Sequence, residues 1–135
     1  MRIFTALALL ATFGFMPAAS AEDCGKAANQ VEMNTCFGQA FKKTDADLNV
    51  VYKQVASRLK DNKEAAAQLI AAERAWVGFR DAQCAFEAIN ALGGSIYPTL
   101  VIQCRSRLTG KRIDDLKALL HCEEGELSCP VPPAD

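Results

Sequence analysis

Few residues in the sequence have the type and spacing that catalysis needs. Nucleophilic and general-base mechanisms rely most often on histidine, and the chain contains a single one, His121. His121 precedes Cys122 at an expected helix end, where the helix dipole favours a cation. Asp45 and Asp47 are two residues apart, so on a helix they do not share a face, and helix-start electrostatics explains them better than glycosidase-like catalysis. We therefore expect a protein that binds a partner and is not an enzyme.

The segment from Glu73 to Asp81, ERAWVGFRD, contains the densest group of charged and aromatic side chains. Trp76 and Arg80 are four residues apart, so on a helix the guanidinium can lie against the indole. One interpretation assigns both aromatic residues, Trp76 and Phe79, to the core and the charged residues to ion pairs with neighbouring helices. The other is a binding site formed by Trp76, Arg80 and Asp81. A carboxylate–arginine catalytic site around Glu73 and Asp81 is a third hypothesis.

A second candidate site is the turn Gly93-Gly94-Ser95-Ile96-Tyr97-Pro98. Paired glycines favour a helix end followed by a turn, so the simpler interpretation is a connection between two helices. The functional interpretation is that Ser95 offers a hydroxyl and Tyr97 an exposed aromatic ring on a loop that a disulfide holds rigid. A rigid loop of this kind suits insertion into a partner's cleft.

All six cysteines follow residue 21, and their number and spacing favour disulfides. No Cys-x-x-Cys pair occurs, so thioredoxin-like chemistry and paired zinc ligands both lack their usual spacing. Haem attachment through Cys-x-x-Cys-His is absent for the same reason. With one histidine, multi-histidine metal sites are excluded as well. We expect no metal, no cofactor and three structural bridges formed in an oxidising compartment.

The pairing of the cysteines follows in part from helix geometry. In an antiparallel helix hairpin, residues equidistant from the turn lie side by side, and Cys84 and Cys104 are each ten residues from Gly94. Cys24 and Cys36 would be about 18 Å apart on one helix, but they can meet if the chain after the first of them folds back. The predicted bridges are Cys84–Cys104, Cys24–Cys36 and, closing a tail loop, Cys122–Cys129. The main rival links one of the first two cysteines to the tail.

The first 21 residues have the features of a secretory signal peptide. A charged Met1-Arg2 precedes an apolar run from Ile3 to Phe15, and Ala19-Ser20-Ala21 offers the small residues that signal peptidase cuts after. The apolar run of about 13 residues is shorter than the roughly 20 of a transmembrane helix. The acidic residues before Cys24 do not fit a lipoprotein cleavage site. We expect cleavage near Ala21 and a periplasmic or secreted mature protein, residues 22–135.

The charge balance excludes one large class of partners. The 135 residues carry a formal net charge of -1, with 15 basic and 16 acidic side chains. Removing Arg2 with the signal leaves 14 basic side chains and a charge of -2. No basic excess is available to neutralise phosphates, so we expect no nucleic-acid binding. We also expect no membrane insertion after signal cleavage, and a protein as the partner.

Three helical segments account for most of the mature chain. The first runs from Asn29, a plausible N-cap, to Asp61-Asn62, with a possible break near Lys43. The second runs from Lys63 to about Asn90, and the third from about Ser95 to Cys122. The buried stripe of the second segment is expected at Leu69, Ala72, Trp76, Phe79 and Phe86, and that of the third includes Leu100. The predicted fold is all-α: an elongated antiparallel three-helix bundle, residues 22–121, stapled by disulfides and followed by an irregular tail, residues 122–135.

The motifs that carry this pattern also occur together in a known bacterial family. They are Cys24 and Cys36 with eleven residues between them, Asp47-Leu48-Asn49-x-x-Tyr52, and the segment from Ala72 to Cys84 with its Trp-x-x-Phe-Arg-Asp-x-x-Cys pattern. Gly93-Gly94-Ser95, Cys104, Thr109, Arg112 and Leu116 continue the match. The sequence resembles the LprI-like lysozyme-inhibitor domain family over residues 24–120. The resemblance implies a small secreted helical domain, with lysozyme inhibition as the activity of some members. The cysteine-closed tail and the missing lipid-anchor signal depart from lipoprotein relatives.

These observations lead to a first hypothesis about function. The protein is expected to be a periplasmic binding protein that inhibits lysozyme-type muramidases by occluding their cleft. Lysozyme cuts with two carboxylates, so hydroxyl or basic groups would serve an inhibitor there, and Ser95, Tyr97 and Arg80 are the candidates. The alternative is a structural or adaptor module that binds another protein of the cell envelope.

Overall fold

The computed structural model describes residues 23–134, and the predicted signal peptide lies outside the described residues. The described part of the chain is helical throughout its regular structure and contains no strand. Its elements in chain order are η1 (Asp23–Lys26), α1 (Gln30–Arg58), α2 (Lys63–Glu87), η2 (Ile89–Ala91) and α3 (Tyr97–Leu119). The predicted all-α fold is confirmed.

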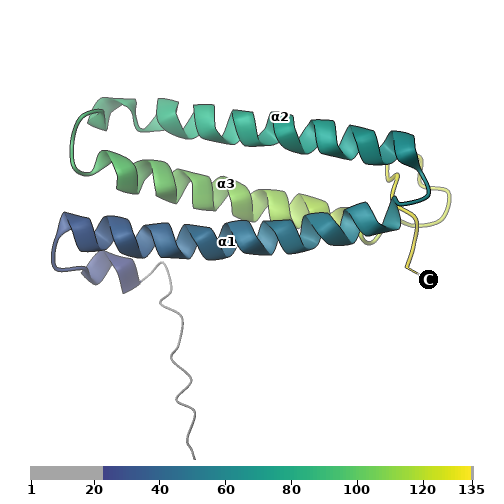
Figure 1. Cartoon of the computed structure of the whole chain (residues 1–135), viewed down its shortest axis with the longest axis horizontal. Helices are drawn as coiled ribbons and strands as arrows, with labels where there is room; N and C mark the ends of the chain where they lie inside the picture. Colours follow the sequence, from purple (N-terminus) through teal and green to yellow (C-terminus); the bar gives the residue numbers. More distant parts are fainter. Residues whose placement is uncertain (1–22, 135) are drawn as a thin grey trace, which may run out of the picture.

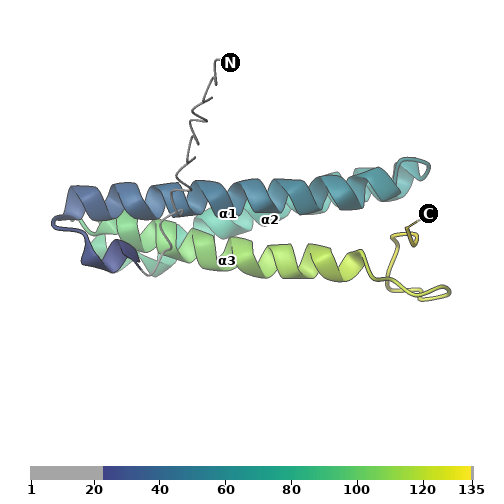
Figure 2. The same cartoon turned by 90° about the horizontal axis from the view of Figure 1, so that it is seen from below.

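The three long helices lie lengthwise beside one another and make a narrow rod (Figures 1 and 2). α1 contains 29 residues, which corresponds to about 44 Å. α2 runs antiparallel to α1 and α3, as short connections require. α3 packs most extensively on α1 and less on α2, whereas α1 and α2 make few contacts with each other. The prediction of an elongated three-helix bundle is therefore confirmed, with α3 as the helix that joins the other two.

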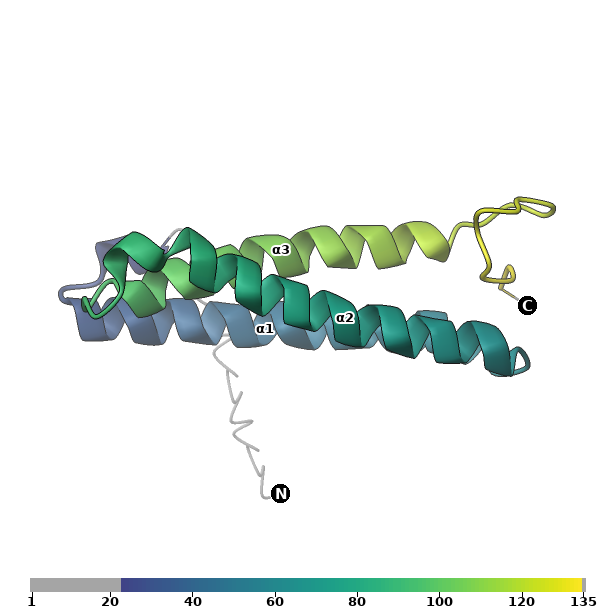
Figure 3. The same ribbon diagram turned by 90° about the horizontal axis from the view of Figure 1, so that it is seen from above.

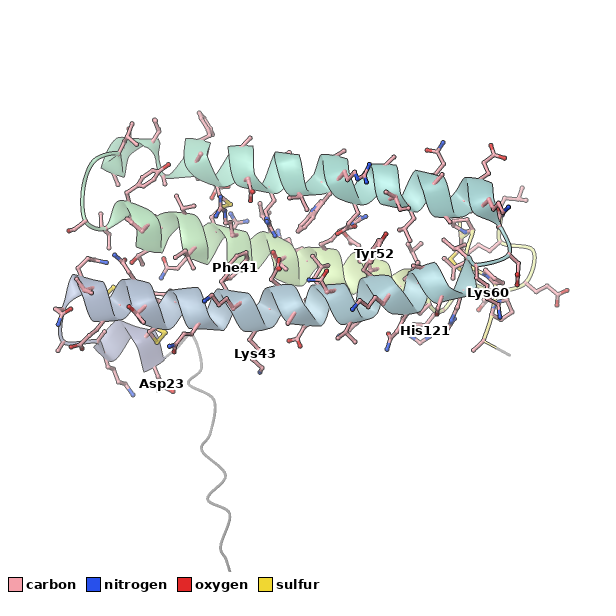
Figure 4. All side chains as sticks on the ribbon, in the orientation of Figure 1. Asp23, Phe41, Lys43, Tyr52, Lys60 and His121 are labelled. Atoms are coloured by element: carbon pink, nitrogen blue, oxygen red, sulfur yellow. A yellow bond between two sulfur atoms is a disulfide. The ribbon has the colours of Figure 1, made fainter. Side chains whose placement is uncertain are left out.

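α1 is one continuous helix, and the possible break near Lys43 does not occur. It begins at Asn29, whose Oδ1 accepts a hydrogen bond from the backbone nitrogen of Glu32 at 2.9 Å. The Glu32 carboxylate in turn accepts from the backbone nitrogen of Ala28 at 3.1 Å. Thr44 does not cap a new helix, because its hydroxyl donates to the carbonyl of Ala40 within α1. Lys43 points away from the other helices into solvent (Figure 4).

The main core lies in the half of the rod away from the α2–α3 turn. Val55 and Leu116 are fully buried at its centre. The other buried members come from all three helices and from the tail: Leu48, Val51, Leu59, Leu69, Ile113 and Val131. A second, smaller cluster of Cys84, Ala88, Val101 and Cys104 fills the space between α2 and α3 near their turn.

The expected buried stripe of α2 is partly wrong. Leu69 is buried and Trp76 packs against the main core, but Ala72 is exposed, as are Phe79 and Phe86. The buried face of α2 passes instead through Leu69, Arg80 and Cys84. Phe79 is one residue away from this face and Phe86 lies about 200° around the helix from Cys84. The stripe is narrow because α2 packs mainly on α3. Leu100 of α3, also expected inside, is 38% exposed.

All three predicted disulfides are present, and the rival pairing of the N-terminal cysteines with the tail does not occur. The Cα atoms are 5.5 Å apart in Cys24–Cys36 and Cys84–Cys104 and 5.4 Å apart in Cys122–Cys129. The first bridge forms because η1 folds back against α1, as the sequence required. The second lies below the α2–α3 turn.

The tail after α3 contributes to the core, which the sequence did not predict. Residues beyond Leu119 have no regular structure, but the chain turns back toward the end of the bundle (Figure 2). Val131 is 2% exposed and belongs to the main core cluster. The tail therefore closes the end of the rod opposite the α2–α3 turn.

Candidate functional site

α2 turns into α3 at one end of the rod (Figures 1 and 3), and large apolar side chains are exposed there. They come from the end of α2, from η2, from the following turn and from the start of α3. We call this group the apolar tip: Phe86 (71% exposed), Ile89 (51%), Leu92 (65%), Ile96 (38%) and Leu100 (38%). Several exposed large apolar side chains gathered at one end of a small protein are a candidate interaction surface.

The turn within the apolar tip is built on two glycines. Gly93 has a φ of 82°, a conformation that side chains with a Cβ rarely adopt. At Gly94 a Cβ would lie 3.1 Å from the carbonyl oxygen of Ala91, whose hydrogen bond from the Gly94 nitrogen closes the turn at 2.9 Å. The turn leaves Ser95 exposed. The two glycines therefore place the hydroxyl-bearing residue on the outer surface.

Hydrogen bonds from the start of α1 support the turn. The carbonyl of Ser95 accepts from Asn34 Nδ2 at 3.4 Å. Thr99, which is 2% exposed, accepts from Gln30 Nε2 at 2.8 Å and donates to Asn34 Oδ1. Tyr97 is half-buried against the second core cluster and is not the exposed aromatic ring that the sequence suggested. The Cys84–Cys104 bridge joins α2 to α3 next to the turn. The turn is therefore held by the hydrogen bonds from α1 and by this disulfide.

A charged pair lies beside the apolar tip. Arg107 of α3 donates to both carboxylate oxygens of Glu87 at 3.0 and 2.8 Å. Hydrogen bonds from the Gln83 side chain and from Arg107 lower the pKa of the Glu87 carboxyl below its ordinary value. Between this pair and Leu100 is a hollow of about 320 Å³. A polar rim thus borders the apolar surface, as in protein–protein interfaces.

The second candidate, around Arg80, lies inside the bundle. Arg80 is 7% exposed. Its guanidinium donates to Asp81 at 3.0 Å, to Asp45 of α1 at 3.2 Å and to Thr109 of α3 at 3.4 Å. Arg105 of α3 is 3.1 Å from the same Asp81 oxygen. This Arg80 cluster joins all three helices, as the ion-pair interpretation of the sequence predicted.

Trp76 completes the cluster as its aromatic partner. The Arg80 guanidinium lies 5.2 Å from the Trp76 ring centre and 5.3 Å from that of Phe41. Arg112 approaches Trp76 to 5.9 Å while donating two hydrogen bonds, of 3.0 and 2.9 Å, to one oxygen of Glu73. The predicted contact between Trp76 and Arg80 is confirmed, although Phe79 takes no part in the core.

The structure does not bring the two groups of candidate residues together. Ser95 and Tyr97 belong to the tip, whereas Trp76, Arg80 and Asp81 belong to the middle of the rod. Thr109, the α3 partner of Arg80, follows Tyr97 by twelve residues, which is about 18 Å of helix. Arg80 is enclosed by its partners and cannot extend into the cleft of another protein.

The apolar residues of the tip were missed in the sequence. The heptad-like pattern of α2 extends to Phe86 and predicted that this side chain is buried in the core. For Ile89, Leu92 and Ile96 the sequence pattern predicted neither burial nor binding. The glycine pair could have indicated their exposure. It marks a turn at the end of the bundle, where no opposite helix is available to bury the three neighbouring apolar residues.

Two further properties of the described residues bear on function. No helix among residues 23–134 has both the length and the apolar character to cross a bilayer. Within the same residues, no three His, Cys, Asp or Glu side chains gather in a way that could hold a metal ion.

Fold and site together define a small, disulfide-bonded, all-helical domain with an apolar surface at one end of a rod. Comparison with known proteins makes the assignment specific. The family described as lysozyme inhibitor LprI matches residues 21–116, and the chain belongs to this family. The resemblance noted in the sequence is thereby confirmed, and the family is one of inhibitors. The match ends before the tail that carries Val131.

A relative and the solved structures complete the comparison. An uncharacterized protein of Rhizobium meliloti (strain 1021) is 38% identical over 113 residues, which cover 76% of this chain and 81% of the relative. No solved structure matches the chain.

Proposed function

We propose that the protein is a secreted, periplasmic inhibitor of lysozyme-type muramidases that blocks the substrate cleft with its apolar tip. Membership of the lysozyme inhibitor LprI family supports inhibition in general. The observation that carries the choice of surface is the exposure of Leu92 and its apolar neighbours around Ser95. Leu92 and Ile96 fill the cleft, and the hydroxyl of the exposed Ser95 meets the catalytic carboxylates, whereas Tyr97, half-buried against the second core cluster, supports the turn from inside.

The physical basis of this inhibition is a surface that is ordered before it binds. Ordering a loop on binding costs about 0.5–1.5 kcal/mol for each immobilised side chain. The bonds from Asn34 to Ser95 and between Thr99 and α1 reduce that cost, as does the Cys84–Cys104 bridge. Burial of apolar side chains then supplies most of the affinity. The net charge of -2 on residues 22–135 favours the approach to a basic enzyme.

The Arg80 cluster has a supporting role in this proposal. Trp76, Arg80 and Asp81 do not contact the enzyme; they hold α1, α2 and α3 together so that the tip keeps its shape. Three disulfides suit the oxidising compartment in which secreted lysozymes act.

The test is cell-wall lysis by lysozyme in the presence of the purified protein, residues 22–135. We expect lysis to slow at micromolar inhibitor. Leu92→Asp should weaken inhibition at least about tenfold, because a charge would be buried in the interface.

A matched control is available at the other end of the rod. Leu127 is fully exposed on the tail, so Leu127→Asp should inhibit as well as the unmodified protein. Undiminished lysis at micromolar excess would contradict inhibition, and equal loss in both variants would contradict the choice of surface.

A further inference from the structure

The tail disulfide, Cys122–Cys129, is the most accessible of the three disulfides. Both of its cysteines are partly exposed, and the residues between them, 123–128, are all exposed. By contrast, Cys84 and Cys104 are 0% and 5% exposed and belong to the second core cluster, between α2 and α3. A thiol must approach a sulfur atom closely in order to exchange with a disulfide. The packing of α2 on α3 therefore protects Cys84–Cys104, whereas the tail disulfide is open to a reductant.

The N-terminal disulfide, Cys24–Cys36, is protected on one side. Cys24 is 1% exposed, because η1 folds back against α1, whereas Cys36 is partly exposed on α1. Attack by a thiol is therefore restricted to one of its two cysteines. Of the three disulfides, Cys122–Cys129 is the one in which both cysteines are accessible to solvent.

Few contacts besides this disulfide attach the tail to the helices. The hydrogen bonds within the tail loop join its residues to one another: the Glu126 nitrogen donates to the carbonyl of Glu123 and the Cys129 nitrogen to that of Glu126, both at 3.2 Å. In the described part of the chain, no hydrogen bond joins residues 123–134 to a helix. The tail is therefore held by the disulfide and by the buried side chain of Val131.

The tail covers an apolar part of the main core. Pro130 and Val131 form one wall of a hollow of about 330 Å³ at this end of the rod. Most of the other walls are apolar side chains from all three helices, among them Val55, Leu59, Leu69 and Leu119. If the tail left this position, these side chains would become accessible to water and to an apolar dye.

The disulfide determines how firmly Val131 is held. Cys122, at the end of α3, packs against the main core, and the bridge keeps the Cα atom of Cys129 within 5.4 Å of that of Cys122. Val131 is thus two residues from a fixed point. Without the bridge, the whole loop regains its conformational freedom, and the burial of one valine offsets little of that loss. Reduction should therefore release the tail.

We propose that Cys122–Cys129 is a redox-sensitive switch: its reduction by a dithiol releases the tail and opens the main core at this end of the rod. A thiolate of the reductant attacks one tail sulfur and forms a mixed disulfide, which the second thiol of the reductant then breaks. Two electrons and two protons pass to the tail cysteines, which end as thiols, and the reductant ends as a disulfide.

The switch is separate from the proposed inhibitory surface. The apolar tip lies at the opposite end of the rod (Figure 1), beside the buried Cys84–Cys104 bridge, so it should keep its shape when the tail is released. The family match covers residues 21–116. The switch therefore lies outside the matched domain.

The experiment is a time course of reduction of residues 22–135 by dithiothreitol, quenched with iodoacetamide and followed by peptide mass spectrometry. We expect Cys122 and Cys129 to be alkylated at least about tenfold faster than the other four cysteines. In parallel, the fluorescence of anilinonaphthalene sulfonate should rise above the level set by the exposed apolar tip, because the opened core binds the dye.

Two variants make the dye measurement specific. The double substitution Cys122→Ser with Cys129→Ser should bind the dye without reductant and gain nothing further under conditions that reduce the tail bridge. Leu127→Asp, at a fully exposed position of the same loop, should behave like the unmodified protein. The order of alkylation in the unmodified protein requires no variant to fold. Equal rates of reduction for all three bridges, or reduction of the tail bridge without any gain in dye binding, would overturn the proposal.

Discussion

Arg80 has few surface atoms and three polar partners on three helices, so its contribution to stability is open to direct measurement. Its side chain donates to Asp45, Asp81 and Thr109 and lies against Trp76. Hydrogen bonds to charged groups contribute about 1.5–3 kcal/mol, and both aspartates remain partly exposed to water in the folded protein. We expect Arg80→Ala to lower the free energy of unfolding by about 2–3 kcal/mol in urea titrations.

Arg74→Ala is the matched control for this change. Arg74 is an exposed cation six residues earlier on the same helix, and its substitution should alter stability by less than about 0.5 kcal/mol. Equal effects of the two substitutions would contradict a structural role for the Arg80 cluster.

The lowered pKa of the Glu87 carboxyl predicts that the stability of the fold depends on pH. Hydrogen bonds from Gln83 and Arg107 lower its pKa in the folded protein. The charged carboxylate therefore stabilises the fold at pH values above the pKa of the unfolded chain, and this stabilisation is lost as the pH falls through the lowered pKa. The melting temperature of Glu87→Gln should lie below that of the unmodified protein at neutral pH and approach it in acid. A difference independent of pH would show that the ion pair contributes nothing.

At the scale of elements, the tail contributes to the core and to stability, although its composition predicts only an irregular segment. Val131 fills the main core from a segment without regular structure. Val131→Ala removes two buried methyl groups, each worth about 0.8 kcal/mol, so unfolding should become easier by about 1.6 kcal/mol. Thermal or urea unfolding measures this, with Leu127→Ala as the exposed control. An unchanged stability in Val131→Ala would mean that the tail does not pack on the core in solution.

The sequence was sufficient for elements that depend on local chemistry. The Asn29–Glu32 cap, the glycine turn and the equidistance of Cys84 and Cys104 from Gly94 all follow from neighbouring residues or from helix geometry. The exposure of Phe86 was not predictable in this way, because it depends on α2 packing mainly on a single neighbouring helix.

Contacts between segments that are far apart in the chain could not be predicted from the sequence pattern either. Besides the adjacent Asp81, the partners of Arg80 lie 35 and 29 residues away along the chain, and nothing local indicates that Asp45 and Thr109 are these partners. The burial of Val131 likewise requires the tail to return to α1 and α2. The apolar tip was missed because its residues belong to three different elements.

At the scale of the whole molecule, the rod separates three tasks along its length. The turn between α2 and α3 and the tail lie at opposite ends of the rod (Figure 1). The tip carries the exposed apolar side chains, the Arg80 cluster joins the three helices, and the tail closes the far end of the core. α3 connects these regions, because both other helices pack on it. The proposed inhibitory surface therefore lies at one end of a scaffold that the other two regions hold together.

The most direct test of cleft occlusion is the steady-state kinetics of lysozyme on a soluble chitooligosaccharide, with substrate in large excess over the inhibitor. A soluble substrate removes any effect of the protein on the cell wall itself. If the apolar tip occupies the cleft, increasing concentrations of residues 22–135 should raise the KM of lysozyme and leave kcat unchanged. Unchanged hydrolysis at micromolar inhibitor, or a lowered kcat at constant KM, would contradict the account.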